Sequence, residues 1–196
     1  VKVGDSVKLG QVLFSDKKTQ GVHYTAPAAG VISAINRGAQ RVLQSVVIDI
    51  DASAGSEDAV EFATCAASDL ASLTTEQVAQ NLQASGLWSA FRTRPFSKVP
   101  AIDSKPRSIF VTAIDTHPLA ADPAPIIAAQ QDEFAQGLQL LTKLTDGLVF
   151  VCAAADTKVP QVDGAQVHRF GGVHPAGLAS TQLHMLDLSL IHFLRC

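Results

Sequence analysis

The chain has 196 residues, of which 47% are hydrophobic and 17% charged, and its formal net charge is −3. This composition is typical of a globular protein rather than a disordered one, and the charge gives no reason to expect nucleic acid as a partner. The length allows one domain with a small second module, and no apolar run reaches the roughly 18 residues of a membrane-spanning helix.

Residues 1–50 have the pattern of a small β-rich module. Apolar residues alternate imperfectly with polar ones, and the turn pair Gly4-Asp5 and the single residues Gly10 and Gly30 interrupt them. Gly and Asp tolerate the positive φ angles of tight turns. Short strands joined by such turns predict a small β-sandwich or barrel.

The opening phrase Val-x-Val-Gly-Asp-x-Val at residues 1–7, followed by Asp16-Lys17 and Ala26-Pro27, resembles biotinyl/lipoyl-type domains. In that family a lysine at a hairpin tip carries the cofactor, and Lys17 or Lys18 would be the matching residue. The interval from these lysines to Ala26-Pro27 is longer than the family's usual spacing. We therefore expect an unmodified barrel, and a lipoyl-type carrier module is the alternative.

An acidic linker is predicted over residues 51–66, between this module and the rest of the chain. It combines small residues with four carboxylates and no base: Asp51, Glu57, Asp58 and Glu61. A charge run of this kind is usually solvated, and its spacing matches no calcium-binding loop. We therefore expect a domain boundary here.

A helix and a buried strand are predicted after the linker. The capping-box pair Thr74 and Gln77 starts a helix over residues 75–84, which Gly86 ends. The near-continuous apolar run over residues 108–113 is typical of a strand that is buried on both faces, as in a parallel sheet.

A second helix and two further strands complete a βαβ pattern. The helix is predicted from Asp122-Pro123 to Lys143, and strands are predicted over residues 148–153 and 167–170. Residues 67–185 should therefore form a Rossmann-like βαβ domain. The predicted fold class is mixed α/β, with an N-terminal small β barrel-sandwich (biotinyl/lipoyl-like) module and this Rossmann-like domain.

The most unusual segment is the connection over residues 85–100, between the first predicted helix and the first buried strand. It contains the only tryptophan of the chain and three cations without an acid. Connections of this length are usually functional or disordered. We expect its large apolar side chains to be buried: Leu87, Trp88, Phe91, Phe96 and Val99. We expect its cations to be exposed, as a surface for an anion or an acidic partner: Arg92, Arg94 and Lys98.

Two groups of residues are candidates for contact with a ligand. The aromatic side chains Trp88, Phe91 and Phe96 could line a quinone-type pocket, with plain packing as the alternative. In a parallel sheet, ligands sit beyond the carboxyl ends of the strands. That rule points to Asp115 and His117, which follow the first buried strand, whereas residues 85–100 enter that strand at its opposite end.

Other kinds of chemistry find no support in the spacing of the residues. The histidines show no metal-ligand spacing and no nucleophile motif is present, so we expect neither a metal site nor a catalytic centre in this chain. The three cysteines lie far apart without a Cys-x-x-Cys pair, which argues against a disulfide framework and favours a reducing compartment: Cys65, Cys152 and Cys196.

Several long blocks resemble the A subunit of the sodium-translocating NADH:quinone reductase of bacteria. The most distinctive is Gly-Leu-Trp-x-Ala-x-Arg-Thr-Arg-Pro-Phe-Ser-Lys-Val-Pro-Ala-Ile over residues 86–102. Similar blocks lie at residues 30–48, 110–121 and 174–179. The resemblance covers essentially residues 1–184, whereas the family's proteins are considerably longer. We therefore expect a truncated piece, and an aberrant tail over residues 186–196.

The resemblance implies a subunit of a membrane complex that oxidises NADH, reduces ubiquinone and exports Na⁺. It places this subunit on the cytoplasmic side of the bacterial inner membrane, held peripherally by other subunits of the reductase, including membrane subunits. FMN, riboflavin, the 2Fe–2S centre and NADH would lie on partner subunits. No cofactor is expected in this chain, and ubiquinone is a candidate ligand.

The same family is related to the flavin-carrying subunit of complex I and to the C subunit of the Rnf complex. In the flavin subunit, a glycine-rich loop cradles FMN at the place of residues 85–100, because backbone N–H groups must approach phosphate closely. Here no glycine occurs between Leu87 and Val99, and Pro95 lacks the N–H. The cradle is therefore absent, which argues against the alternative of a soluble flavin- and NADH-binding oxidoreductase.

Overall fold

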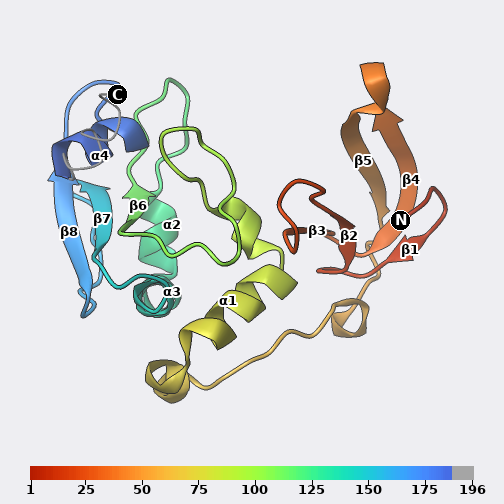
Figure 1. Ribbon diagram of the computed structural model, residues 1–196, viewed down its shortest axis with the longest axis horizontal. Coiled ribbons are helices and arrows are strands. Elements are labelled where there is room, and N and C mark those ends of the chain that lie inside the picture. Colours follow the sequence, from red (N-terminus) through yellow and green to blue (C-terminus); the bar gives the residue numbers. More distant parts are fainter. Residues whose placement is uncertain (187–196) are drawn as a thin grey trace. The chain divides into compact units, whose positions relative to one another are not determined.

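The computed structural model describes residues 1–186 and divides into two compact units (Figure 1). Unit 1 contains Val1–Thr64 and Ala79–Ser104, and unit 2 contains Cys65–Val78 and the chain from Lys105 on. The predicted division at residues 1–50, 51–66 and 67–185 stays a prediction, and the contacts assign residues 79–104 to the β-rich unit. The aberrant tail was predicted over residues 186–196, and all of it beyond Leu186 lies outside the described residues.

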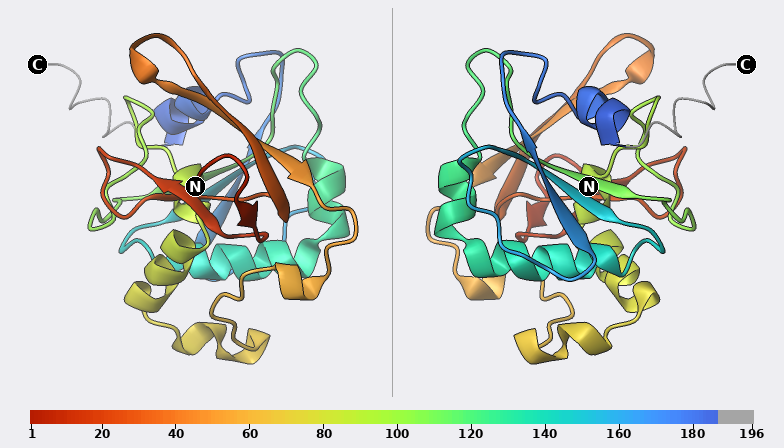
Figure 2. Two further views of the ribbon diagram at one scale, coloured as in Figure 1. Left: turned by 90° about the vertical axis from the view of Figure 1, so that its right-hand side faces the viewer. Right: turned by 90° about the vertical axis from the view of Figure 1, so that its left-hand side faces the viewer.

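Unit 1 contains two small antiparallel sheets. One has the order β1-β4-β5, from β1 (Ser6–Val7), β4 (Gly30–Arg37) and β5 (Leu43–Ile50). The other is the hairpin of β2 (Val12–Ser15) and β3 (His23–Thr25). Figure 2 shows β4 and β5 as the long twisted ribbon of this unit.

The core of unit 1 follows from the alternation of side chains along its strands. Along β4, Gly30 and Ile32 are buried while Val31 and Ser33 are exposed, because successive residues of a strand point to opposite faces. Ile32 is fully buried and packs in one cluster with residues of both sheets: Val7, Leu13, Ala26, Ile35, Val46 and Ile48. The predicted β-rich module is thereby confirmed.

Helix α1 (Thr75–Ala84) has the bounds that the capping pattern predicts. The backbone N–H of Thr74 donates to Gln77 Oε1 at 2.9 Å, and the N–H of Gln77 donates to Thr74 Oγ1 at 3.3 Å. Gly86 then adopts a left-handed φ of 80° after the helix end. Within residues 1–186 the chain also forms four short 3₁₀ helices: η1 (Ala39–Arg41), η2 (Ser56–Asp58), η3 (Ala67–Ser72) and η4 (Leu87–Ala90).

Unit 2 is built on a three-stranded parallel sheet of order β6-β7-β8, as the apolar runs predict. Its strands are β6 (Ile109–Ala113), β7 (Val149–Ala154) and β8 (Ala165–Phe170), which run side by side in the right-hand view of Figure 2. Since parallel strands share their direction, the carboxyl ends of all three meet at one edge of the sheet.

Helices cover both faces of this sheet. On one face, Ile127 of α2 (Ala124–Ala129) and Leu138 of α3 (Gln131–Thr142) pack in one cluster with alternate strand residues: Ala113, Val149, Val151 and Ala153. On the other face, α4 (Ala179–Leu186) contributes Leu186 to a cluster with Ile114, Cys152 and Phe170. This arrangement confirms the parallel α/β character of the domain.

The prediction of one helix from Asp122-Pro123 to Lys143 is wrong. The chain leaves the helical conformation at Gln130, where φ is −132° and ψ is 49°, and this residue separates α2 from α3. The apolar stripe gives no sign of the break, because Ile127 and Leu138 reach the same core cluster on either side of it.

The buried sheet predicts a large difference in thiol reactivity. Cys152 is fully buried, and burial raises the pKa of its thiol to about 12, whereas Cys65 is exposed. Because the thiolate is the reacting form, a thiol reagent at pH 8 should modify Cys65 rapidly and Cys152 only after unfolding. Peptide mapping by mass spectrometry separates the two sites, and rapid modification of Cys152 in the folded chain would contradict the packing of β7.

Candidate functional site

The residues of the helix–strand connection in unit 1 pack directly on the β2–β3 hairpin. Thr25 Oγ1 donates to the carbonyl oxygen of Ser85 at 3.2 Å. A Cβ added to Gly86 would lie 2.8 Å from Thr25 Oγ1, and one added to Gly21 would lie within 2.3 Å of Ile102 Cδ1. Both positions need glycine, because each combines this close approach with a positive φ.

Trp88 fixes the connection by contacts with its own residues. Its side chain is 5% exposed, its indole N–H donates to the carbonyl oxygen of Pro100 at 3.0 Å, and its ring meets Phe91 edge to face with centroids 5.4 Å apart. A buried indole N–H that is satisfied by the backbone is typical of a packing residue. The geometry therefore favours packing over a ligand-lining role for Trp88 and Phe91.

Residues 93–98, which we call the tip, form a closed turn that projects an aromatic ring and two cations. The backbone N–H and the Oγ1 of Thr93 both donate to the carbonyl oxygen of Lys98, at 2.7 and 3.0 Å. Phe96 is 77% exposed, and Lys98 Nζ lies 5.9 Å from the centre of its ring. The tip thus combines a fixed backbone with an apolar and cationic surface.

The expectation that all large apolar side chains of this connection are buried is wrong for two of them. Leu87 is 59% exposed and Phe96 is 77% exposed. Phe96 lies within the turn that Thr93 and Lys98 close. Leu87 starts the 3₁₀ helix η4, in which Trp88 is the buried residue.

The three cations of the connection are exposed, but they differ in their surroundings. Arg92 Nη1 donates to the carbonyl oxygens of Ser89 and Phe91, so this guanidinium caps the end of η4. Neither Arg94 nor Lys98 makes an ion pair with any residue between 1 and 186. Arg94 and Lys98 are therefore the cations available to a partner.

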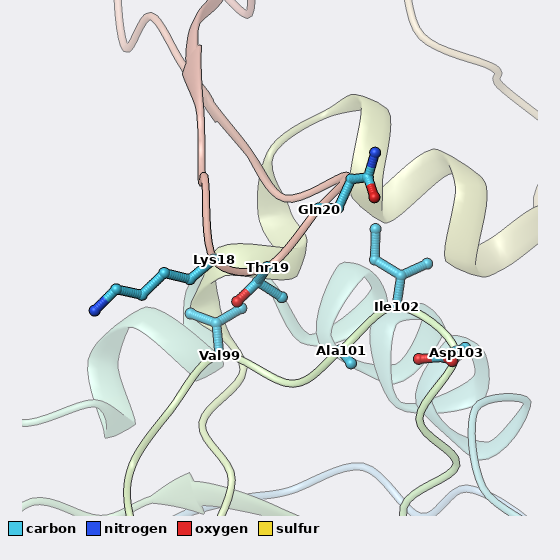
Figure 3. Close-up of a pocket in the computed structure, with 7 residues that line it drawn as sticks. All are labelled: Lys18, Thr19, Gln20, Val99, Ala101, Ile102 and Asp103. Carbon is cyan, nitrogen blue, oxygen red and sulfur yellow. The ribbon is translucent and has the colours of Figure 1, made fainter.

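A hollow of about 420 Å³ lies between the tip of the β2–β3 hairpin and the later part of the connection (Figure 3). Its lining comes from both segments: Lys18, Thr19, Gln20, Val99, Ala101, Ile102 and Asp103. Figure 3 shows the Lys18 side chain extending away from Ile102 and Asp103.

In unit 2, Asp115 and His117 lie together where β6 ends. The Nδ1 of His117 is 2.6 Å from Asp115 Oδ1, and the backbone N–H of His117 donates to the same oxygen at 2.9 Å. These hydrogen bonds, first the backbone one and then that of the imidazole, hold the pKa of the Asp115 carboxyl below its usual value of 3.8.

His174, which the sequence did not single out as a site residue, joins this pair. It follows β8, its ring lies 4.8 Å from that of His117, and its Nδ1 lies 3.3 Å from Thr116 Oγ1. The backbone N–H of Gly177 donates to the same Oγ1 at 2.9 Å, and a Cβ at Gly177 would lie only 2.6 Å from the Thr116 nitrogen. The glycine-rich residues 171–177 are the only sequence signal for this contact, because the two histidines are far apart in the chain.

The residues that the sequence singled out therefore form two groups in different units. Trp88, Phe91, Arg92 and the tip belong to unit 1, and Asp115 and His117 belong to unit 2. Among residues 1–186, no group of three or more His, Cys, Asp or Glu side chains is arranged to hold a metal ion. No helix within the same residues is long and apolar enough to cross a bilayer.

Family models match most of the chain. One, described as the NqrA N-terminal barrel-sandwich hybrid domain, matches residues 1–51, and another, described as the NqrA second alpha/beta domain, matches residues 73–190. They confirm the predicted fold class of a barrel-sandwich module and an α/β domain.

Curated relatives are named as the A subunit of Na(+)-translocating NADH-quinone reductase. The protein of Cellvibrio japonicus is 60% identical over 189 residues, that of Shewanella amazonensis 57% over 186, and that of Hahella chejuensis 56% over 189. Each match covers 95% of this chain and 41% of the relative, so the chain spans about two fifths of the length of the curated relatives it matches. The resemblance drawn from the sequence is confirmed.

The contrast between Trp88 and Phe96 predicts opposite effects of two similar truncations. Trp88→Ala should destabilise unit 1 by about 3–5 kcal/mol, because it removes a buried aromatic ring. Phe96→Ala should change the stability by no more than about 0.5 kcal/mol, because its ring is largely solvated. Urea denaturation followed by circular dichroism measures both, and equal effects would show that the tip is packed rather than exposed.

Proposed function

Since the chain belongs to the NqrA family, we propose that it acts as part of the A subunit of a complex that oxidises NADH, reduces ubiquinone and exports Na⁺. The observation that carries this proposal is identity of 54–60% along almost the whole chain to proteins of that name. We place the chain peripherally, on the cytoplasmic side of the inner membrane, held there by the membrane subunits of the reductase.

We further propose that this part of the protein carries no flavin or NADH of its own. Residues 87–99 contain no glycine, and three of their backbone N–H groups are bonded within the connection: Ser89 donates to Gly86, Phe91 to Trp88 and Thr93 to Lys98. A phosphate cradle needs N–H groups that are free and converge on the anion. FMN, riboflavin, the 2Fe–2S centre and the NADH site would then belong to other subunits.

The tip supplies the contact surface in this proposal. Exposed aromatic rings and arginines are the side chains that most often dominate binding at protein interfaces. Arg94 and Lys98 flank Phe96 and are free to pair with acidic groups, and such charges accelerate encounter with a complementary surface. Asp115 and His117, at the ligand-binding edge of the parallel sheet, are the candidates for a ubiquinone contact.

The absence of a nucleotide cradle is tested by titration. The chain at tens of micromolar should show no change in FMN fluorescence and no heat on addition of FMN or NADH, because residues 87–99 lack the glycines that let backbone N–H groups approach a phosphate. A flavodoxin titrated under the same conditions serves as the positive control. Stoichiometric binding of either nucleotide would refute this part of the proposal.

The role of the tip is tested by removal of its charges. The double variant Arg94→Gln/Lys98→Gln should keep its thermal unfolding temperature, since exposed charges typically contribute within about 0.5 kcal/mol. The same replacements in a full-length relative should lower its co-purification with the membrane subunits. The wild-type interaction should also weaken with rising salt, because exposed charges are screened beyond about 8 Å at physiological ionic strength.

Lys17→Gln/Lys18→Gln is the matched control, because it removes two exposed cations from the same unit without touching the tip. It should leave co-purification unchanged. If both double variants assemble like the wild type, the tip is only a packed turn. If the tip variant unfolds instead, its cations are buried and paired. Failure of the wild type to co-purify with any reductase subunit would contradict the proposed function itself.

A further inference from the structure

We propose that His117 and His174 form a binding site for a divalent transition-metal ion of the Zn²⁺ type, with water completing its coordination. Asp115 and Thr116 orient the two imidazoles through contacts with their Nδ1 atoms. The site lies entirely in unit 2. It shares Asp115 and His117 with the ubiquinone contact proposed above and shares no residue with the tip.

The hydrogen bond to Asp115 prepares His117 as a metal ligand. Because the Asp115 carboxylate lies 2.6 Å from Nδ1 and can only accept, Nδ1 is the donor in this contact and Nε2 is the ring nitrogen left for a metal. Oδ1 is itself fixed by the backbone N–H of His117 at 2.9 Å. A carboxylate that accepts from the far nitrogen of a metal-binding histidine is the usual support in protein metal sites, where it sets the ring orientation and raises the basicity of the ligand.

His174 has a longer contact of the same kind with Thr116. Its Nδ1 lies 3.3 Å from Thr116 Oγ1, and that oxygen is held by the backbone N–H of Gly177 at 2.9 Å. A hydroxyl oxygen has two lone pairs, so it can accept from Gly177 and from a protonated Nδ1 at once. The Nε2 of His174 is then free to bind a metal. Neither Nε2 atom makes a hydrogen bond with any residue from 1 to 186.

The two rings are close enough to share one ion. Their centroids are 4.8 Å apart at an interplanar angle of 49°, and both side chains are open to solvent. With Zn–N bonds of about 2.0–2.1 Å, two nitrogens on a tetrahedral ion lie roughly 3.3 Å apart. Binding of one ion therefore requires the two rings to turn until their Nε2 atoms reach that separation.

The ligand set decides which ion fits. Asp115 faces Nδ1 of His117 and does not serve as a third ligand, in agreement with the absence of any three-ligand group among the described residues. Two imidazoles with water favour Zn²⁺, Cu²⁺, Ni²⁺ or Co²⁺, whereas Mg²⁺ and Ca²⁺ prefer oxygen ligands. A bound ion would link the segment after β6 to the segment after β8, at the carboxyl edge of the sheet.

Isothermal titration of the chain with Zn²⁺ at pH 7.5 tests the proposal. His117→Ala and His174→Ala should each abolish most of the binding, while His184→Ala, which removes an exposed histidine of α4, should leave it unchanged. Asp115→Asn keeps both imidazoles and should weaken the affinity 10- to 100-fold, because the loss of a supporting carboxylate typically has this effect. Mg²⁺ should produce no heat.

The outcomes distinguish a metal site whose imidazoles are supported by Asp115 and Thr116 from two exposed histidines that merely lie close together. Wild-type affinity no greater than that of the His117→Ala/His174→Ala variant would overturn the proposal. Unchanged affinity in Asp115→Asn would show an unsupported surface pair and would overturn it equally. If an alanine variant does not fold by circular dichroism, His174→Gln takes its place. None of these results bears on co-purification with the reductase, so the two proposals fail separately.

Discussion

The direct packing of residues 85–102 on the β2–β3 hairpin is the contact on which the structure of unit 1 depends. It requires two positions without a side chain, since a Cβ at Gly86 or at Gly21 would meet Thr25 or Ile102. It also requires Trp88, whose buried ring and hydrogen bond to Pro100 draw the two ends of the connection together. A long connection without regular strands thereby becomes a fixed part of the β-rich unit.

This contact limits what unit 1 is able to do. The hairpin that would carry a modified lysine in a lipoyl-type domain packs on Ile102 close to its tip, although its two lysines, Lys17 and Lys18, are exposed. The connection also lacks the glycines that a flavin cradle would need, and three of its backbone N–H groups are bonded within the connection itself. Residues 93–98 of the connection, the tip, expose Arg94, Phe96 and Lys98. This surface is suited to binding a partner rather than to catalysis.

Local signals explain which parts of the fold were predictable. The capping pair Thr74 and Gln77 gave the bounds of α1, and apolar runs gave the parallel strands, because both depend on neighbours in the chain. The break at Gln130 was missed, since the apolar stripe continues across it. Phe96 was expected inside because of its type, whereas a turn of six residues decides its exposure. His174 was missed as a partner of His117, because only the parallel order of β6, β7 and β8 brings the two segments together.

The division of polar groups within unit 2 follows from the sheet. Both faces of the sheet are occupied by apolar clusters, so charged and hydrogen-bonding side chains collect where the strands end. There Asp115, Thr116 and Gly177 satisfy one side of each imidazole and leave the other side of His117 and of His174 open. The tip offers cations and an aromatic ring to a partner, while the strand ends offer imidazole nitrogens. Because the two groups share no residue, a change at one acts on its own unit, and a loss of docking and a loss of metal affinity report separate properties of the chain.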